Sequence, residues 1–299
     1  MPTSLAYVLV IVIWSTTPLA IKWSAVDDGY AFAVLARMLI GAVLAVALTA
    51  SWRVGLPLHA RARRSYLAGG LGIFGAMYCT YWGARFIDSG LVSVLFGLAP
   101  LVTSLLAMRW LEEPALSPSR VAGMLLALAG LAVIFAMGAR LEGDSALAGM
   151  AALLLAVLIY SASLVWIKRI GDDSPPLATT AGSLLVAVPL FVLAWGVADG
   201  RVPASVSPRA SAAIAYLAVF GSVLGFTLYY QVVKRLEAGR VALITLITPV
   251  LALGLGHAAN GEVVSARVWL GTVLISLGLA LHQWDALAGW WLQRRGEEA

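Results

Sequence analysis

Ten long apolar runs constrain this chain more than any other feature of its sequence. Each is about 20 residues long, the length of helix that crosses a hydrocarbon layer of about 30 Å. The runs cover Leu5–Trp23, Tyr30–Trp52, Tyr66–Phe86, Gly90–Leu111, Arg120–Met137, Ala146–Trp166, Pro176–Val197, Ser211–Val233, Val241–Ala259 and Val268–Trp284. Strands of a membrane barrel would show stretches of about ten residues with alternating polarity instead. We therefore predict an all-α membrane protein with ten transmembrane helices joined by short loops.

Composition excludes the soluble classes. Hydrophobic residues make up 61% of the 299 residues and charged residues only 12%, whereas soluble domains have about 45–50% and about 25%. One soluble core could not bury so much apolar surface, which rules out a soluble enzyme, a nucleic-acid-binding module and a disordered chain. The lone cysteine, Cys79, cannot form an intrachain disulfide, and no metal-ligand spacing is present. We expect no metal and no cofactor.

Basic residues are distributed unevenly between alternate loops. If the N-terminus is cytoplasmic, 13 Lys and Arg residues fall on the inner side and 6 on the outer side. Basic residues are retained preferentially on the cytoplasmic side of membrane proteins. The bias predicts a multi-pass protein of a bacterial-type inner membrane, with both termini in the cytoplasm.

The two halves of the chain resemble each other. A shift of 149 residues brings Gly90 onto Gly239, Pro100 onto Pro249 and Glu113 onto Glu262. Leucine-rich helices match by chance, but paired mid-helix prolines and paired acidic turns argue against chance. We predict two five-helix repeats, residues 1–143 and 144–299, within one membrane domain. Because five is odd, equivalent helices cross the membrane in opposite directions, as in alternating-access transporters.

The ends of the two halves resemble a known family. Arg85–Ile134 and Lys234–Leu281 each contain a glycine-led helix with a central proline, an acidic turn and a glycine-rich helix. This pattern is similar to EamA-type transporters of the drug/metabolite transporter superfamily, over essentially the whole chain. Within that group the chain most resembles bacterial YddG-type amino-acid exporters. One departure is the second acidic turn at Glu262, which lacks the basic residue that often follows.

Polar aromatic residues on two helices are candidates for substrate binding. On the third helix they share one face with Arg85, and their repeat equivalents share a face with Lys234. The candidates are Tyr78, Tyr81 and Trp82, with Tyr230 and Gln231 as equivalents. The alternative is an interfacial belt, where Tyr and Trp gather beside basic residues. We favour a cavity lining, because Tyr78 and Tyr81 lie deeper than a belt requires.

A second candidate group lies halfway along the first helix. Trp14 and Ser15 lead a polar cluster at mid-span, and Tyr160 and Ser161 occupy the equivalent place in the sixth helix. Polar residues at this depth should face the protein interior. An aromatic and hydroxyl-bearing midplane site suits neutral amino acids. Packing between helices, where Ser and Thr are common, is an equal alternative.

Five residues are candidates for gating or hinge motion. Arg37, about 10 Å into the second span at 1.5 Å per residue, could attract a carboxylate, bond to backbone carbonyls or extend outward. We favour a structural or gating role for it. Pro100 and Pro249 each remove a backbone donor at mid-helix, so they predict kinks. The glycines that lead these two helices, Gly90 and Gly239, join the same group.

Together these features predict an inner-membrane exporter of amino acids, aromatic and other neutral ones, or of similar small metabolites. All fifteen acidic residues lie outside the middle of the spans, which favours facilitated diffusion over proton coupling. The alternatives are a membrane-embedded lipid-modifying enzyme, a channel-like pore and, among transporters, drug efflux or metabolite uptake. No catalytic constellation is visible, so we do not expect an enzyme. Expected partners are a small-molecule substrate and the lipid bilayer, not nucleic acid, for a monomer or homodimer.

Overall fold

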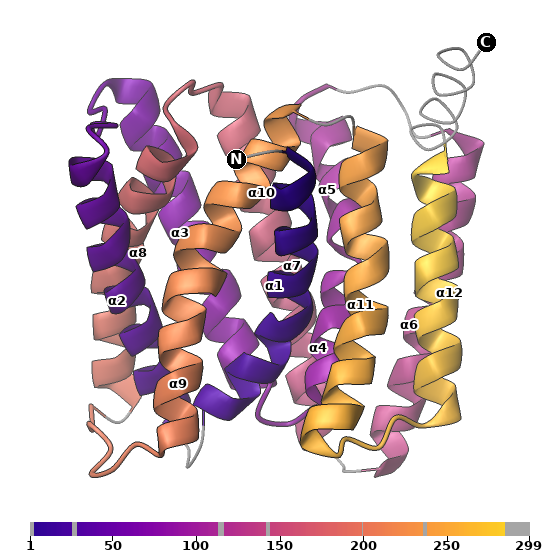
Figure 1. Ribbon diagram of the computed structural model, residues 1–299. Coiled ribbons are helices and arrows are strands. Elements are labelled where there is room, and N and C mark those ends of the chain that lie inside the picture. The colour runs from indigo at the N-terminus through magenta and orange to yellow at the C-terminus, as the bar shows by residue number, and fades with distance from the viewer. Residues whose placement is uncertain are drawn as a thin grey trace.

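The fold is a bundle of helices that run up and down (Figure 1). The computed structural model describes residues 3–25, 29–112, 117–141, 144–198, 200–235 and 238–284, and these contain no strand. Ten helical segments result: α1 (Thr3–Ser24), α2 (Tyr30–Ser51), α3 (Ala60–Gly83), α4 (Ser89–Phe96) with α5 (Ala99–Trp110), α6 (Pro118–Leu141), α7 (Asp144–Ile170), α8 (Pro176–Ala198), α9 (Pro208–Tyr216) with η1 (Leu217–Leu224) and α10 (Gly225–Arg235), α11 (Ala238–Asn260) and α12 (Ala266–His282). The predicted all-α architecture is confirmed.

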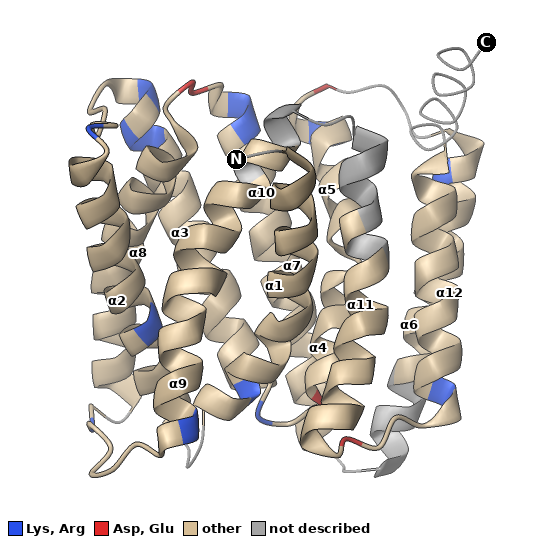
Figure 2. Cartoon of the chain, in the orientation of Figure 1, with Lys and Arg blue, Asp and Glu red and all other residues tan. Residues whose placement is uncertain are grey.

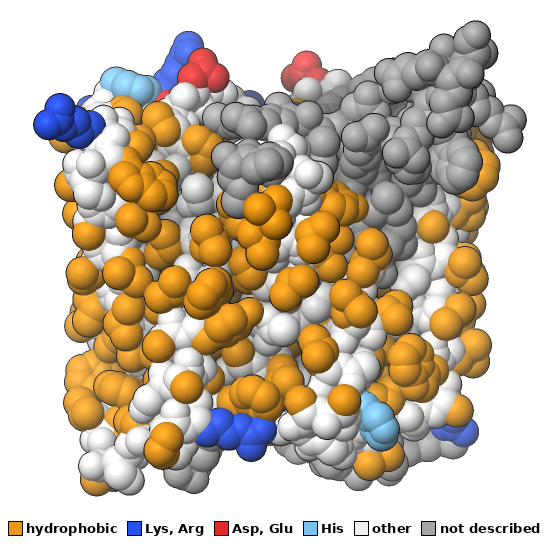
Figure 3. Space-filling view, viewed as in Figure 1, with side chains coloured by type: hydrophobic (Ala, Val, Ile, Leu, Met, Phe, Trp, Pro, Cys, Tyr) orange, Lys and Arg blue, Asp and Glu red, His pale blue; other side chains and the backbone are white. Residues whose placement is uncertain are grey.

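The surface has the character of a membrane protein. Six described segments are long and apolar enough to span a bilayer: Thr3–Ser24, Tyr30–Ser51, Ser89–Trp110, Ser145–Ile170, Pro176–Ala198 and Pro208–Tyr229. On the face that Figure 3 shows, hydrophobic side chains spread broadly across the middle of the molecule. Charged residues gather mainly toward the two ends of the bundle (Figure 2). α1 begins and α12 ends at the same end (Figure 1).

α3 begins at Ala60, whereas the sequence predicted a start at Tyr66. The ring of His59 accepts a hydrogen bond from the backbone N–H of Ala62 at 3.2 Å and so caps the helix. Such a cap satisfies a backbone donor that the first turn leaves free. The sequence suggested a loop here because the residues are basic, but they form the first turns of the helix.

Two segments are interrupted near their middles. α4 ends at Phe96 and α5 begins at Ala99, with Pro100 in the first turn of α5. Proline tolerates this position because its missing N–H would be unpaired there anyway. In the eighth segment, Leu217–Leu224 winds as a π-helix between α9 and α10. Such wide turns are rare and are often found at functional sites.

Packing divides the bundle into a central group and a lateral pair. α3 packs against α7 and α8, α1 against α9, α10 and α11, and α2 against α8 and η1. α4 packs on α11, and α5 on α7. α6 and α12 pack mainly on each other, at one side of the bundle (Figure 1).

Glycines allow the lateral pair to approach closely. A Cβ atom on Gly130 of α6 would lie 2.6 Å from the carbonyl oxygen of Gly271 in α12, and one on Gly271 would lie 2.8 Å from that of Gly130. Gly123 and Gly278 meet in the same reciprocal way. Any larger residue would force these helices apart, as at small-residue interfaces of other membrane helices.

Candidate binding cavity

A cavity of about 480 Å³ opens between α1, α3, α4–α5, α7 and the η1–α10 segment. This volume is within the range of sites for small organic ligands, about 300–1,000 Å³. Aromatic side chains form much of its wall, namely Trp14, Phe96, Tyr160, Phe226 and Tyr229. Polar side chains are interspersed, namely Thr17, Thr80, Ser93, Thr103, Ser104, Thr248 and Gln283, with Arg37 as the charged member.

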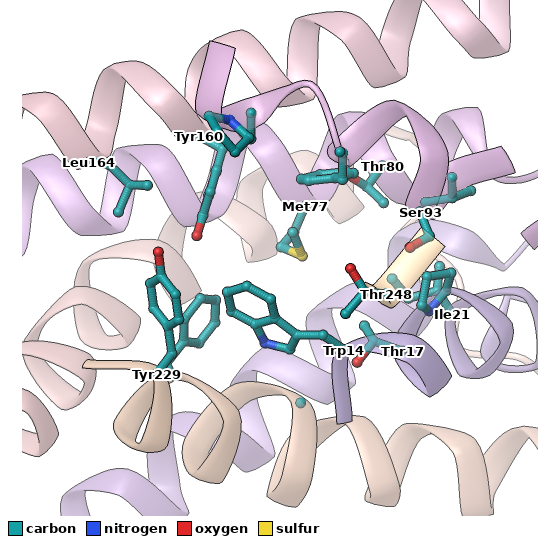
Figure 4. Close-up of a pocket in the computed structure, with 18 of the residues that line it drawn as sticks. Trp14, Thr17, Ile21, Met77, Thr80, Ser93, Tyr160, Leu164, Tyr229 and Thr248 are labelled. Atoms are coloured by element: carbon teal, nitrogen blue, oxygen red, sulfur yellow. The ribbon is translucent and has the colours of Figure 1, made fainter. Parts of the chain in front are cut away.

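The aromatic residues come from four helices, α1, α4, α7 and α10, and line the same cavity. The rings of Trp14 and Tyr229 lie 4.6 Å apart between centroids at an angle of 37°. Phe96 and Tyr160 meet edge to face, with centroids 6.2 Å apart. The hydroxyl ends of Tyr160 and Tyr229 point toward the same space, with the indole of Trp14 beside them (Figure 4). This arrangement offers apolar ring faces together with hydroxyl groups.

The polar residues around Trp14 are satisfied within α1. Ser15 donates to the carbonyl oxygen of Ile11 at 2.7 Å, and Thr17 to that of Ile13 at 2.6 Å. Hydroxyls often bond to the carbonyl four residues earlier in this way. Ser15 is buried and does not line the cavity. Of the predicted midplane candidates, Trp14 and Tyr160 do line it.

Most of the predicted stripe on α3 and α10 lies outside the lining. The hydroxyl of Tyr78 is 3.2 Å from that of Tyr30, and Trp82 packs against Phe86. Tyr81 is fully buried. Gln231 is absent from the lining, and the side chain of Tyr230 lies outside the described part of the chain.

The lining residues of these two helices stand one position earlier than the predicted stripe. Met77 and Thr80 of α3, and Phe226 and Tyr229 of α10, face the cavity. A one-residue offset turns a helical face by about 100°. The sequence favoured the neighbouring face because tyrosine and tryptophan are typical of binding sites, whereas methionine and phenylalanine resemble ordinary core residues. The 149-residue shift between the halves also relates Met77 to Phe226 and Thr80 to Tyr229, and this relation was the sequence signal that could have identified these four residues.

Arg37 is buried at depth, with 2% of its surface exposed. Its Nε donates to the Oγ of Ser222 in η1 at 3.0 Å. Its guanidinium carbon lies 6.0 Å from the ring centroid of Tyr81, so Tyr81 stands beside the guanidinium rather than in the cavity. The side chain of Arg37 reaches the cavity wall.

The predicted hinge residues lie in unequal surroundings. Pro100 lines the cavity at the start of α5, whereas α11 runs unbroken through Pro249. A Cβ on Gly97 would lie 3.5 Å from Cγ of Pro249, so this proline lies beside the break between α4 and α5. Gly90 packs closely on Leu253. The surroundings of Gly239 lie outside the described residues.

A hydrogen-bond network joins residues that lie two or three positions along the chain from the cavity-lining residues Ile21 and Val92. Glu262, 6% exposed, accepts from the Oγ of Ser89 at 2.9 Å, from the N–H of Gly90 at 3.3 Å and from the Nδ2 of Asn260 at 3.0 Å. Trp23 donates to the Oδ1 of Asn260 at 3.0 Å. The network thereby joins α1, the start of α4 and the loop after α11. The sequence marked Glu262 only as half of a pair of acidic turns.

Comparison with known sequences places these features in a family. The sequence profile of the EamA-like transporter family matches residues 1–136 and, a second time, residues 147–282. A probable terminal-alkyne amino-acid exporter of Streptantibioticus cattleyicolor is 28% identical, over 92% of this chain and 87% of its own length. A probable amino-acid metabolite efflux pump of Salmonella typhimurium is 25% identical, over 92% of each.

Two further likenesses cover almost the whole chain. The uncharacterized transporter YoaV of Bacillus subtilis is 24% identical, over 93% of this chain and 95% of its own length. A crystal structure of another protein superposes with a TM-score of 0.68 at 23% identity, covering 95% of this chain and 98% of that one. The structural likeness shows a shared fold.

Proposed function

The chain belongs to the EamA-like transporter family, and we propose that it exports amino acids, aromatic and other neutral ones, across a bacterial inner membrane. The observation that carries this proposal is the cavity of about 480 Å³ inside the bundle, which combines ring faces with hydroxyl groups. Such a wall suits a small solute with one apolar and one polar end. The names of the relatives in Streptantibioticus and Salmonella support the same substrate class.

The mechanism that we propose is alternating access between two inverted five-helix repeats. Support comes from lining residues that recur at a fixed spacing. Trp14 with Tyr160 and Pro18 with Leu164 are 146 residues apart, and Met77 with Phe226 and Thr80 with Tyr229 are 149 apart. Helix packing recurs as well, since the contact of α3 with α7 has a counterpart in that of α9–α10 with α1. A cavity between such repeats is the usual substrate site of these transporters.

The distribution of charge supports a direction for the chain in the membrane. Basic residues favour the cytoplasmic side for the end at which α1 begins and α12 ends. The Glu262 network then lies toward the outer end, because Trp23 is two residues beyond the lining residue Ile21 and Ser89 is three residues from the lining residue Val92. In this orientation the described contacts close the cavity toward the outside, as in the inward-facing half of the cycle. Opening outward requires that network to separate.

The test is transport by the full chain in liposomes. Vesicles loaded with labelled phenylalanine, leucine or methionine should release the label along its gradient, in a saturable manner, and should show counterflow when unlabelled substrate is placed outside. Saturation and counterflow separate a carrier from a pore, which would pass current instead. Release no faster than from protein-free vesicles, for every amino acid in the panel, would refute the proposal.

A further inference from the structure

We propose that Arg37 binds a carboxylate of the substrate, so that the cavity selects organic solutes that carry an anionic group. The proposal rests on the proposed function for the rest of the substrate, which is an amino acid. It differs from the structural or gating role that the sequence favoured for Arg37.

The guanidinium has hydrogen-bonding capacity left over. Arginine has five N–H donors in a planar fork. Nε of Arg37 donates to Ser222 at 3.0 Å, but Nη1 is buried without a hydrogen-bond partner among the described residues. A buried charged donor without a partner is costly, so a ligand that accepts from it gains affinity.

The charge of Arg37 has no counterion among the residues that the structure describes. Among the described residues the ion pairs join Lys22 to Asp88 and His59 to Asp172, and neither includes Arg37. The described residues that line the cavity include no aspartate and no glutamate. A cation at depth in a membrane protein is usually paired or lies in a ligand pathway. Here an anionic ligand can supply the missing charge.

The backbone of η1 packs closely against the guanidinium, and only a glycine fits beside it. Gly221, in the π-helical turn of η1, lines the cavity beside Arg37. A Cβ at this glycine would lie 3.1 Å from Nη2 and 3.7 Å from the guanidinium carbon. Ser222 and the ring of Tyr81 hold the group from other sides. The fork is thereby positioned before the ligand arrives, which favours bidentate binding of a carboxylate.

The cavity then has two ends of different chemistry. Arg37 takes the carboxylate, and the rings of Trp14, Tyr160 and Tyr229 receive the apolar side chain of an amino acid. The same arrangement disfavours an organic cation, because its charge would repel the unpaired guanidinium. The substrate class is therefore amino acids and other amphipathic carboxylates, not cationic drugs.

Four related probes test this assignment: phenylalanine, phenylalaninamide, phenethylamine and 3-phenylpropionate. The first readout is thermal stabilisation of the purified full chain in detergent, and the second is counterflow in liposomes. Both acids should stabilise the protein, and the amide and the amine should need at least about tenfold higher concentrations. In Arg37→Gln this discrimination should vanish, and in the control Arg267→Gln, which removes an exposed arginine of α12, it should persist.

Two milder variants cover the case in which Arg37→Gln does not fold. Arg37→Lys keeps the charge and loses the fork, and Gly221→Ala displaces the guanidinium without removing it. Each should weaken the preference for acids by several fold. Equal stabilisation by acid and amide, or no stabilisation by either acid, would overturn the assignment. Stabilisation by the acids without counterflow would refute the proposed transport but support carboxylate binding by Arg37. Counterflow without a preference for acids would support the proposed transport but refute carboxylate binding by Arg37.

Discussion

The Oγ of Ser89 donates to the Oε2 of Glu262 at 2.9 Å, and this bond joins the first family-matched stretch of the chain to the second. Ser89 begins α4, and Glu262 lies in the loop between α11 and α12. The carboxylate also accepts from the N–H of Gly90. Because a carboxylate near a helix N-terminus is favoured by the helix dipole, this contact is suited to hold the two stretches together at one end.

In the proposed orientation, Glu262→Gln should destabilise the closure of the cavity at its outer end. Loss of a buried, charge-assisted hydrogen bond should lower the free energy of unfolding by about 1–3 kcal/mol. It should also raise the population of states with an open outer end. Thermal unfolding measures the first effect. Labelling of Val92→Cys from outside, in a Cys79→Ser background, measures the second.

The control for Glu262 is Asp88→Asn. Asp88 forms an exposed pair with Lys22 at 3.5 Å at the same end of the molecule, and exposed pairs contribute at most about 1 kcal/mol. Its removal should change labelling little. If labelling at position 92 is equally slow in Glu262→Gln and in the parent protein, the network does not close the cavity.

Trp14→Ala should raise the half-saturation concentration for phenylalanine by about tenfold or more, because it removes a ring that stacks with Tyr229 and faces the cavity. Tyr78→Phe should leave transport near normal, because its hydroxyl meets Tyr30 outside the lining. Flux assays in liposomes compare the two. Trp269→Ala, on the exposed side of α12, controls for the loss of a tryptophan. Normal transport by the Trp14 variant would place the binding site elsewhere.

Pro100→Ala should slow turnover more than it weakens binding. It restores a backbone donor beside the break at Gly97, which favours a continuous helix through α4 and α5 and restricts their relative motion. Pro249→Ala should have a smaller effect, because α11 already continues through this proline. Turnover and affinity are measured separately by flux and by thermal stabilisation. Equal turnover in both variants and the parent would reduce these prolines to packing residues.

Gly130→Ala should destabilise the protein by about 1–3 kcal/mol, because the new methyl group would meet the carbonyl of Gly271 at 2.6 Å and force α6 from α12. Substrate affinity should stay the same, since no described lining residue belongs to α6. Thermal unfolding with and without phenylalanine checks both statements. Gly254→Ala is the matched control, because a Cβ there meets nothing within 4 Å.

Transport should not respond to an imposed pH gradient. Proton coupling needs a titratable group that alternates between the two sides, and the described cavity lining holds no carboxylate. Arg37 cannot serve, because arginine stays protonated. Efflux from liposomes with and without a gradient is the measurement. Accumulation against the substrate gradient, driven by pH and abolished by an ionophore, would contradict this expectation.

Sequence reasoning predicted the fold better than the site. Apolar runs mark the helices, and acidic residues and prolines between them mark the loops. The architecture therefore follows from local sequence pattern. The face of α3 that lines the cavity depends instead on how helices rotate against their neighbours. Thr80 and Met77 face the cavity and Tyr78 does not, and no local pattern distinguishes these choices. The π-helical turn beside Arg37 likewise has no signal in the residues that form it.

The matched positions of the cavity wall carry unequal side chains. In the proposed repeats Met77 is matched with Phe226 and Thr80 with Tyr229, so a solute meets a different surface on each side of the same cavity. The half-saturation concentrations measured from the two faces of the membrane should therefore differ. An uncoupled carrier produces no net flux at equal concentrations, so the ratio of maximal rate to half-saturation concentration must be the same in both directions. The face with the weaker apparent affinity must then be the one with the faster maximal rate.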